Sequence, residues 1–385
     1  MRSAPTTSLD LTDPAVVADP YPHLAAQRTE APVAWHEASG SWLVLSHPVV
    51  SRVQRDRRLG RLWTDREPAS YLEPFNLLHR NQMMENEPPE HTRLRRPVAS
   101  SFSRGHVERL RPRARELAAG LLEEAGERFD LIEAYAEPLP VLVICELLGV
   151  PASHVGDLRR WSQAIVRMYE PAPSSGVVDA AVGAASDFAA LVRDLVAVRR
   201  RQPADDLVSD LAATELSDDE VVAAVVLLLN AGHEASVNVF GNGMVAMLRA
   251  GVRPAAGAEA TCVEEMLRFD SALQLFERTA TETVELTEQV TVEPGEKVAV
   301  LLGAANRDPE VFAEPDAFDP ARDPNPHLAF GVGVHFCLGA PLARMELAES
   351  LGLLLARRPD LALAGEPRSR GTFVLRGYHA VPVAG

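Results

Sequence analysis

Ten residues near the C-terminus, Phe330 to Gly339, combine one cysteine with three glycines, one histidine and two phenylalanines. Cys337 precedes a helical pattern that runs from Ala340 to Arg358, so we expect its sulfur at the start of a helix. Free N–H groups and the helix dipole favour a thiolate there. The glycines let the backbone fold closely around the sulfur and a large planar partner, and N–H donors to a metal-bound sulfur tune its electron donation. The pattern predicts a thiolate ligand to a flat, apolar metal cofactor.

The other two cysteines, Cys145 and Cys262, lack such neighbours and are expected to be small buried hydrophobes. Three cysteines cannot form a disulfide framework for a chain of this size. The absence of a second Cys or His at zinc spacing beside Cys337 argues against a structural zinc site. A cysteine nucleophile would need a base, whereas glycines and phenylalanines suit a planar apolar cofactor, and haem with one axial thiolate fits.

With this loop, the sequence resembles the cytochrome P450 monooxygenases of the soluble bacterial class, over nearly the whole chain. The resemblance implies haem b (iron protoporphyrin IX) with Cys337 as the axial thiolate, and O₂ as co-substrate. The residues that the resemblance assigns to haem binding are His91, Arg95, Ala231, Gly232, Arg278, Phe330, Gly331, His335, Cys337 and Gly339.

Four of these residues carry a positive charge or can donate hydrogen bonds. His91 and Arg95 are four apart and share one helix face, which by itself favours a solvated basic surface. By resemblance they hold the haem propionates together with Arg278 and His335, since carboxylates favour bidentate donors.

A second motif is Glu265-Met266-Leu267-Arg268, followed by Arg322 in the segment Phe318 to Arg322. A glutamate and an arginine three apart are usually an exposed pair worth a few tenths of a kcal/mol. The resemblance instead implies that Glu265, Arg268 and Arg322 form a buried structural network.

The third motif lies inside an apolar helix, at Asn230 to Ser236. A carboxylate and a glycine in a buried helix are costly unless the site has a use. Ala231, Gly232 and Glu234 match the family's oxygen-binding helix, but Ala235 stands where the family usually has the threonine that helps to deliver protons. Ser236, an ordered water or a hydroxyl group of the substrate would replace it. Alternatively, Ala235 only enlarges the pocket. The predicted catalytic residues are Glu234, Ala235 and Ser236.

The composition restricts the kinds of protein that can carry these motifs. The chain has 385 residues, 46% of them hydrophobic, and a net charge of -16, which excludes a disordered chain and disfavours nucleic-acid binding. The N-terminal sequence lacks a signal peptide, and the longest apolar run, Val221 to Leu229, is about half of the ~20 residues of a membrane span. We therefore expect a cytoplasmic protein with no membrane and no nucleic-acid partner.

The elements that position the motifs are mainly helical, with small β-sheets (α+β). We expect the P450 fold as a single domain over residues 1–385, with a surface segment at 1–20 and a long buried central helix. That helix starts at the capping box of Ser217 and Glu220 and, if unbroken to Leu248, is about 45 Å long. The other expected elements are a hairpin (33–36 and 42–45), an irregular stretch (60–89), helices (91–250) with a break at 170–176, a shortened helical region (249–264), strands (284–286, 290–292, 297–302) and a final helix (340–358).

The sequence has no G-x-G-x-x-G motif between a strand and a helix, so electrons must come from another protein. The expected partners are a ferredoxin and an NAD(P)H-dependent ferredoxin reductase, with the enzyme itself a monomer. Arg93, Arg96 and Arg104 form either the docking patch or an ordinary solvated face.

The resemblance also implies a mainly apolar substrate pocket, suited to a macrolide, terpenoid, aromatic or cyclic-peptide natural product. Oxidative coupling of aromatic rings and a haem-based ligand sensor without turnover are the alternatives. The predicted substrate contacts are Trp63, Phe75, Met83, Met84, Val166, Tyr169, Gln274, Leu275, Phe276 and Val374.

Overall fold

The computed structural model describes residues 5–385, which form two compact units of interleaved segments. Unit 1 comprises the chain up to Arg61 together with Asn238–Cys337 and Arg358–Gly385, and unit 2 comprises Leu62–Val237 and Leu338–Arg357. Neither unit is a contiguous piece of chain, and the single domain over residues 1–385 remains a prediction. Residues 1–4 of the expected surface segment lie outside the described residues.

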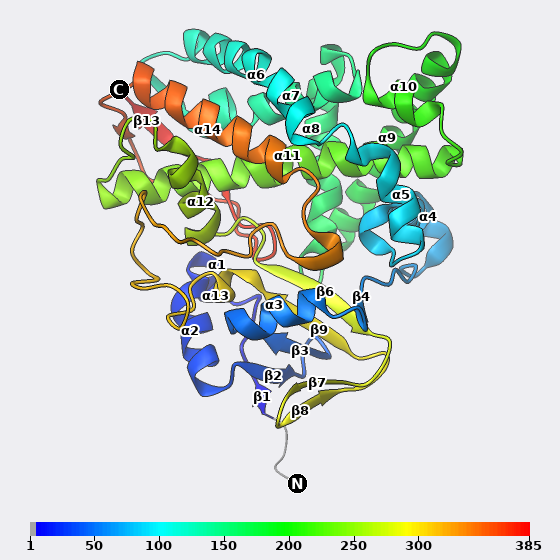
Figure 1. Ribbon diagram of the computed structural model, residues 1–385, viewed down its shortest axis with the longest axis vertical. Coiled ribbons are helices and arrows are strands. Elements are labelled where there is room, and N and C mark those ends of the chain that lie inside the picture. Colours follow the sequence, from blue (N-terminus) through cyan, green and yellow to red (C-terminus); the bar gives the residue numbers. More distant parts are fainter. Residues whose placement is uncertain (1–4) are drawn as a thin grey trace. The chain divides into compact units, whose positions relative to one another are not determined.

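A six-stranded mixed sheet organises unit 1 (Figure 1). Its spatial order is β1 (Thr6–Thr7), β2 (Val33–His36), β3 (Ser41–Val44), β9 (Lys297–Leu301), β6 (Leu275–Ala280) and β4 (Leu59–Gly60). The predicted hairpin is confirmed: β2 and β3 are antiparallel with Trp35 opposite Trp42. Val50 and Val53 of α3 (His47–Arg55) pack with Val44 and Val298 in the hydrophobic core beside this sheet.

The remaining elements of unit 1 are mostly short. They are α1 (Pro14–Ala18), α2 (Pro20–Glu30), the second part of α11, α12 (Glu259–Phe269), β7 (Val284–Thr287), β8 (Val290–Val292), α13 (Leu302–Ala305), η5 (Gly333–His335), β10 (Ala362–Leu363), β11 (Arg368–Ser369), β12 (Tyr378–Ala380) and β13 (Pro382–Ala384). Residues 251–258 form no helix, as predicted from their glycines and proline.

Unit 2 consists almost entirely of helices (Figure 1). They are α4 (Ala69–Arg80), η1 (Met83–Glu85), α5 (Glu90–Ala99), α6 (Arg104–Glu124), η2 (Ile132–Ala136), α7 (Pro138–Leu148), η3 (Ala152–His154), α8 (Val155–Val166), η4 (Arg167–Tyr169), α9 (Ser175–Arg201), α10 (Leu207–Ala212), the first part of α11 and α14 (Ala340–Arg357), with one short strand, β5 (Arg128–Asp130). A break separates η4 from α9 as predicted, but it covers residues 170–174 rather than 170–176.

Helix α11 runs without interruption from Asp218 to Ala250. The predicted capping box precedes it, since the Glu220 N–H donates to the Ser217 hydroxyl and the Ser217 N–H to the Glu220 carboxylate. The helix is long and apolar enough to cross a membrane, but 72% of its most hydrophobic window is buried inside the protein. That burial is typical of a core helix, as the apolar run from Val221 to Leu229 predicted.

The prediction of an irregular stretch at 60–89 was wrong for twelve of its residues, which form α4. Pro68 before the helix and Pro74 inside it resemble loop signals, because proline lacks an N–H and restricts the preceding residue. The buried positions of α4 include Leu72, Phe75 and His79, at helical spacing. Packing of this face offsets the cost of the internal proline.

Candidate active site

The loop around Cys337 is held by its own backbone. The Cys337 N–H donates to the Phe330 carbonyl at 2.9 Å, and the Phe336 N–H donates to the Gly333 carbonyl at 3.1 Å. Gly333 has φ = +80°, and a Cβ added to it would lie 2.5 Å from the Gln54 carbonyl oxygen. Both the conformation and the close approach of α3 therefore require glycine at this position.

Cys337 differs from the other two cysteines in how deeply its side chain is buried. Cys145 and Cys262 are buried, and desolvation raises the pKa of each thiol to about 12. These two sulfurs are protonated at neutral pH and unsuited to bind a metal. Cys337 is partly exposed, and α14 begins three residues further along the chain.

Arg278, the predicted propionate partner in β6, is a buried guanidinium. Its Nη1 donates to the Glu277 carbonyl at 3.0 Å, and its Cζ lies 5.1 Å from the centre of the Phe276 ring. His335, the other predicted partner in unit 1, ends η5 two residues before Cys337. Gly331 precedes it with φ = +63°.

The structure brings Glu265, Arg268 and Arg322 together in unit 1. Glu265 and Arg268 have no exposed surface, and Arg268 donates both Nε and Nη2 to the Glu265 carboxylate at 2.7 Å. Arg322 Nε donates to the same carboxylate at 3.0 Å. The second guanidinium and three backbone carbonyls around Arg268 compensate charges that would otherwise be costly to bury.

His91 and Arg95, the propionate partners predicted in unit 2, lie on α5. His91 is buried and Arg95 is half-buried, one turn further along the helix. A buried imidazole and a half-buried guanidinium on one helix face are suited to an anionic group.

The middle of α11 contains small residues that differ in exposure from their neighbours. Ala231 is exposed and Ala235, one turn later, is half-buried, although the helix is buried on both sides of them. Gly232 has a different surrounding, since a Cβ there would lie 3.0 Å from Ile144 Cγ1 of α7. Gly232 thus allows close packing of two helices, a role that the sequence analysis did not predict.

Glu234 is buried beside a histidine that the sequence analysis missed. His233 Nδ1 lies 2.8 Å from the Leu229 carbonyl, which only accepts hydrogen bonds, so Nδ1 carries a proton. His233 Nε2 lies 3.3 Å from Glu234 Oε1. The Ser236 hydroxyl donates to the Gly232 carbonyl at 3.4 Å. No spacing rule points to His233, because a single buried histidine in a helix is usually structural.

Three of the predicted substrate contacts meet in unit 2. Trp63, Phe75 and Tyr169 all pack around His79 of α4, which the sequence analysis did not single out. Phe75 is fully buried, whereas Trp63 and Tyr169 are partly exposed. The other three predicted contacts in this unit are Met83, Met84 and Val166, of which the two methionines are half-buried in η1 and the valine is buried at the end of α8.

The predicted substrate contacts of unit 1 surround the start of β6. Gln274 is fully buried, and its side-chain NH₂ group donates to the Ser271 carbonyl and the Tyr21 hydroxyl. Leu275 and Phe276 are half-buried in β6, and the Gln274 N–H donates to the carbonyl of Val374.

The residues present fit a haem. A partly exposed thiol follows a tight glycine loop, buried cationic or donor groups occur in both units, and Ala231 and Ala235 leave one face of α11 uncovered by large side chains. Among residues 5–385, no cluster of three His, Cys, Asp or Glu side chains could hold a separate metal ion. The single thiol therefore suits a cofactor that brings its own metal.

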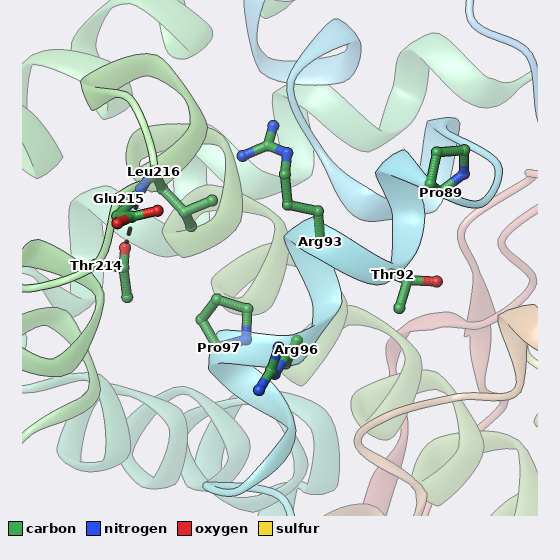
Figure 2. A pocket seen from close by; sticks show the side chains of 8 residues that line it. All are labelled: Pro89, Thr92, Arg93, Arg96, Pro97, Thr214, Glu215 and Leu216. Carbon is green, nitrogen blue, oxygen red and sulfur yellow. Dashed lines mark hydrogen bonds between the residues drawn. The ribbon is translucent and has the colours of Figure 1, made fainter.

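A cavity of about 580 Å³ lies on unit 2 between α5 and the turn before α11. Figure 2 shows Arg93, Arg96 and Pro97 of α5 on one side of it, and Thr214, Glu215 and Leu216 on the other. Arg93 forms ion pairs with Glu90 and Glu220. Within the part of the chain that the structure describes, Arg96 and Arg104 form no ion pair, so their charges are available to a partner.

Similarity to known proteins agrees with these features. The family model for cytochrome P450 matches residues 260–357. Cytochrome P450 monooxygenase PikC of Streptomyces venezuelae is 37% identical, over 99% of this chain and 94% of its own. The 6-deoxyerythronolide B hydroxylase of Saccharopolyspora erythraea is 36% identical, over 98% and 99%. The structure of P450BioI with a fatty-acyl carrier protein has a TM-score of 0.92 at 29% identity, over 97% of this chain and 100% of that chain.

Proposed function

Since the chain belongs to the cytochrome P450 family and is a haem-thiolate monooxygenase, we propose that it oxidises a fairly bulky, apolar small molecule in natural-product biosynthesis. The 6-deoxyerythronolide B hydroxylase among its relatives supports this substrate class. The observation that carries the proposal is the backbone-held loop around Cys337, which is the one partly exposed cysteine among residues 5–385.

Cys337 would bind the haem iron through its thiolate, and His91, Arg95, Arg278 and His335 would hold the haem propionates. When bound, the haem would supply the activation of O₂ and the oxidation of a C–H bond, and the Cys337 thiolate would donate electron density to it. The chain's own contribution is a rigid thiolate, four donors for two carboxylates, and a helix face at Ala231 and Ala235 that admits a large planar group.

Glu234 would relay protons to the reaction. Its carboxyl lies at the centre of α11 beside His233 Nε2, so the pair is able to hold a proton away from bulk solvent. Ala235 contributes no hydroxyl group, and the Ser236 hydroxyl makes only a long bond to Gly232 that is easily exchanged for water or substrate. Ordered water or a substrate hydroxyl would complete the path.

Electrons would arrive from an acidic ferredoxin and its NAD(P)H-dependent reductase. Arg96 and Arg104 are exposed on and just after α5, and charge complementarity would steer an acidic partner to them. Arg93 is already neutralised by two glutamates of its own chain and would contribute less. The enzyme would act as a cytoplasmic monomer.

The substrate would contact mainly apolar side chains. We assign this role to Trp63, Phe75, Met83, Met84, Val166, Tyr169, Gln274, Leu275, Phe276 and Val374. Gln274 and Phe75 are buried, so they would shape the pocket from behind its surface.

Oxidative coupling of aromatic rings is the second candidate, because Ala235 removes the usual proton-delivering alcohol. Mass spectrometry of the product separates the two: oxygenation adds one oxygen atom, whereas coupling removes two hydrogens.

The decisive first experiment is an absorption spectrum of the purified, reduced protein under carbon monoxide. A strongly red-shifted Soret band supports thiolate ligation and the proposed chemistry. A protein expressed with added haem that shows no haem band would exclude the proposal.

A further inference from the structure

A buried histidine, His79, lies at the centre of the aromatic side chains of unit 2 that we assign to substrate. The side chain is 1% exposed. Its ring centre lies 3.9 Å from that of Phe75 and 4.8 Å from that of Trp63, both nearly parallel, and Tyr169 meets it edge-on at 5.8 Å. Three aromatic residues from three segments of the chain, Trp63 before α4, Phe75 in α4 and Tyr169 in η4, thus share one neighbour.

Two hydrogen bonds define the imidazole tautomer. Nδ1 lies 2.7 Å from the Phe75 carbonyl, and Nε2 lies 3.0 Å from the Tyr169 hydroxyl. Because the carbonyl only accepts, Nδ1 carries the proton of the neutral ring and Nε2 accepts from Tyr169. This hydrogen bond therefore joins α4 to η4, with Tyr169 as the donor and His79 as the acceptor.

A second hydrogen bond joins η4 to the residues before α4. Arg66 Nη1 donates to the Met168 carbonyl at 2.9 Å. Asn76 of α4 holds Arg66 in place, because its side chain accepts from the Arg66 N–H and donates to the Arg66 carbonyl. A third contact, from Tyr71 to Asp179 of α9, is exposed. The two partly buried hydrogen bonds thus end on neighbouring residues, Met168 and Tyr169.

We propose that His79 is a positioning residue that determines which ligands the protein admits, an inference that rests on the function proposed above. His79 and Phe75 have almost no exposed surface, whereas Trp63 and Tyr169 are partly exposed. The His79–Tyr169 bond fixes these two rings relative to each other. A bulky ligand must break this bond to enter or leave, and a small ligand passes without doing so.

The test compares Tyr169→Phe, His79→Phe and the double variant in the haem-loaded full chain. Stopped-flow spectroscopy measures binding and release of econazole as the bulky probe and imidazole as the small one. Each single change should speed econazole exchange by about three- to tenfold, the worth of one hydrogen bond. The double variant should be no faster than the faster single variant, because both remove the same bond. Imidazole rates should stay within about twofold of wild type.

Tyr71→Phe is the matched control, since it removes a hydroxyl that ties α4 at an exposed position. Econazole rates in this variant should change less than about twofold. Hydrogen exchange of 69–80 provides a readout independent of the haem, and it should accelerate in Tyr169→Phe without a change in global unfolding. An additive double variant, or an equal effect of Tyr71→Phe, would overturn the role of His79.

The two proposals fail in different ways. If econazole and imidazole leave the wild-type Soret band unchanged, the haem-thiolate function is wrong. If the wild type responds and all variants exchange econazole at the wild-type rate, only the inference about His79 is wrong.

Discussion

The loop 330–337 and the segment 62–85 are held in place by different kinds of contact. In the loop, backbone groups bond one another, two glycines have positive φ, and the Gln54 carbonyl leaves no space for a Cβ at Gly333. In the segment, side chains make the connections: Asn76 holds Arg66, and His79 joins α4 to Tyr169. Backbone conformation and backbone contacts thus hold the loop, whereas hydrogen bonds of side chains hold the segment.

The two kinds of contact suit two kinds of site. The loop would hold a group that stays the same, the cofactor, and the segment would meet a group that can change, the substrate. A backbone-held loop keeps one thiolate geometry and tolerates few substitutions. Side-chain ties are changed by single substitutions with a limited effect on the rest of the fold. A protein can therefore keep its cofactor chemistry while the segment that meets the substrate changes.

The largest expected effect is at the thiolate itself. Cys337→Ala should abolish the red-shifted carbon monoxide band and all oxidation, because the ligand to iron is lost. Cys145→Ala is the matched control: its thiol is buried and protonated, so the spectrum should be retained with a small loss of stability. Normal turnover in Cys337→Ala would contradict the assignment of the ligand.

Gly333→Ala tests whether backbone geometry holds the loop. The positive φ and the approach of Gln54 should together lower the free energy of unfolding by about 2–4 kcal/mol. Gly371→Ala has a positive φ of +66° but no atom within 4 Å of the new Cβ, and should cost about 1 kcal/mol. Urea denaturation measures both values, and equal costs would mean that the approach of α3 is unimportant.

Asn76→Ala tests whether side chains hold the segment. Two backbone groups of Arg66 lose their partner, at a cost of about 1–3 kcal/mol. We expect this cost to appear as local opening, with faster hydrogen exchange and proteolysis at 62–68. Asn81→Ala, which removes one bond to the Leu77 carbonyl, should leave those residues protected. A purely global loss of stability would remove the contrast with the loop.

The smallest expected effect concerns α5 and the start of α6, where nearby arginines differ in whether they already form ion pairs. The double variant Arg96→Gln/Arg104→Gln should slow reduction by a surrogate acidic ferredoxin by about two- to fivefold at low salt, without altering ligand binding. Arg93→Gln should have a weaker effect because its charge is neutralised within the chain. If the double variant and Arg93→Gln slowed reduction equally, the ferredoxin would dock on another surface.

Prediction from sequence succeeded where the pattern was local. The Trp35–Trp42 hairpin has alternating residues around a glycine turn, and α11 begins with a capping box before an apolar run, so short-range geometry specifies both. Prediction failed for α4, because Pro68 and Pro74 are loop signals that its buried face outweighs. His79 and His233 carried no recognisable spacing, so neither was found.

By itself, the sequence determined the family, the haem and a mainly helical fold. The glycines around Cys337 and the Glu265–Arg268 motif are residue types that few other structures require in that order. Only the tertiary structure decided which side chains act together: that Gly232 accommodates Ile144, that His233 faces Glu234, and that His79 joins Tyr169. The physical reason is separation along the chain. Backbone conformation depends on neighbouring residues, whereas hydrogen bonds between side chains depend on how distant segments pack.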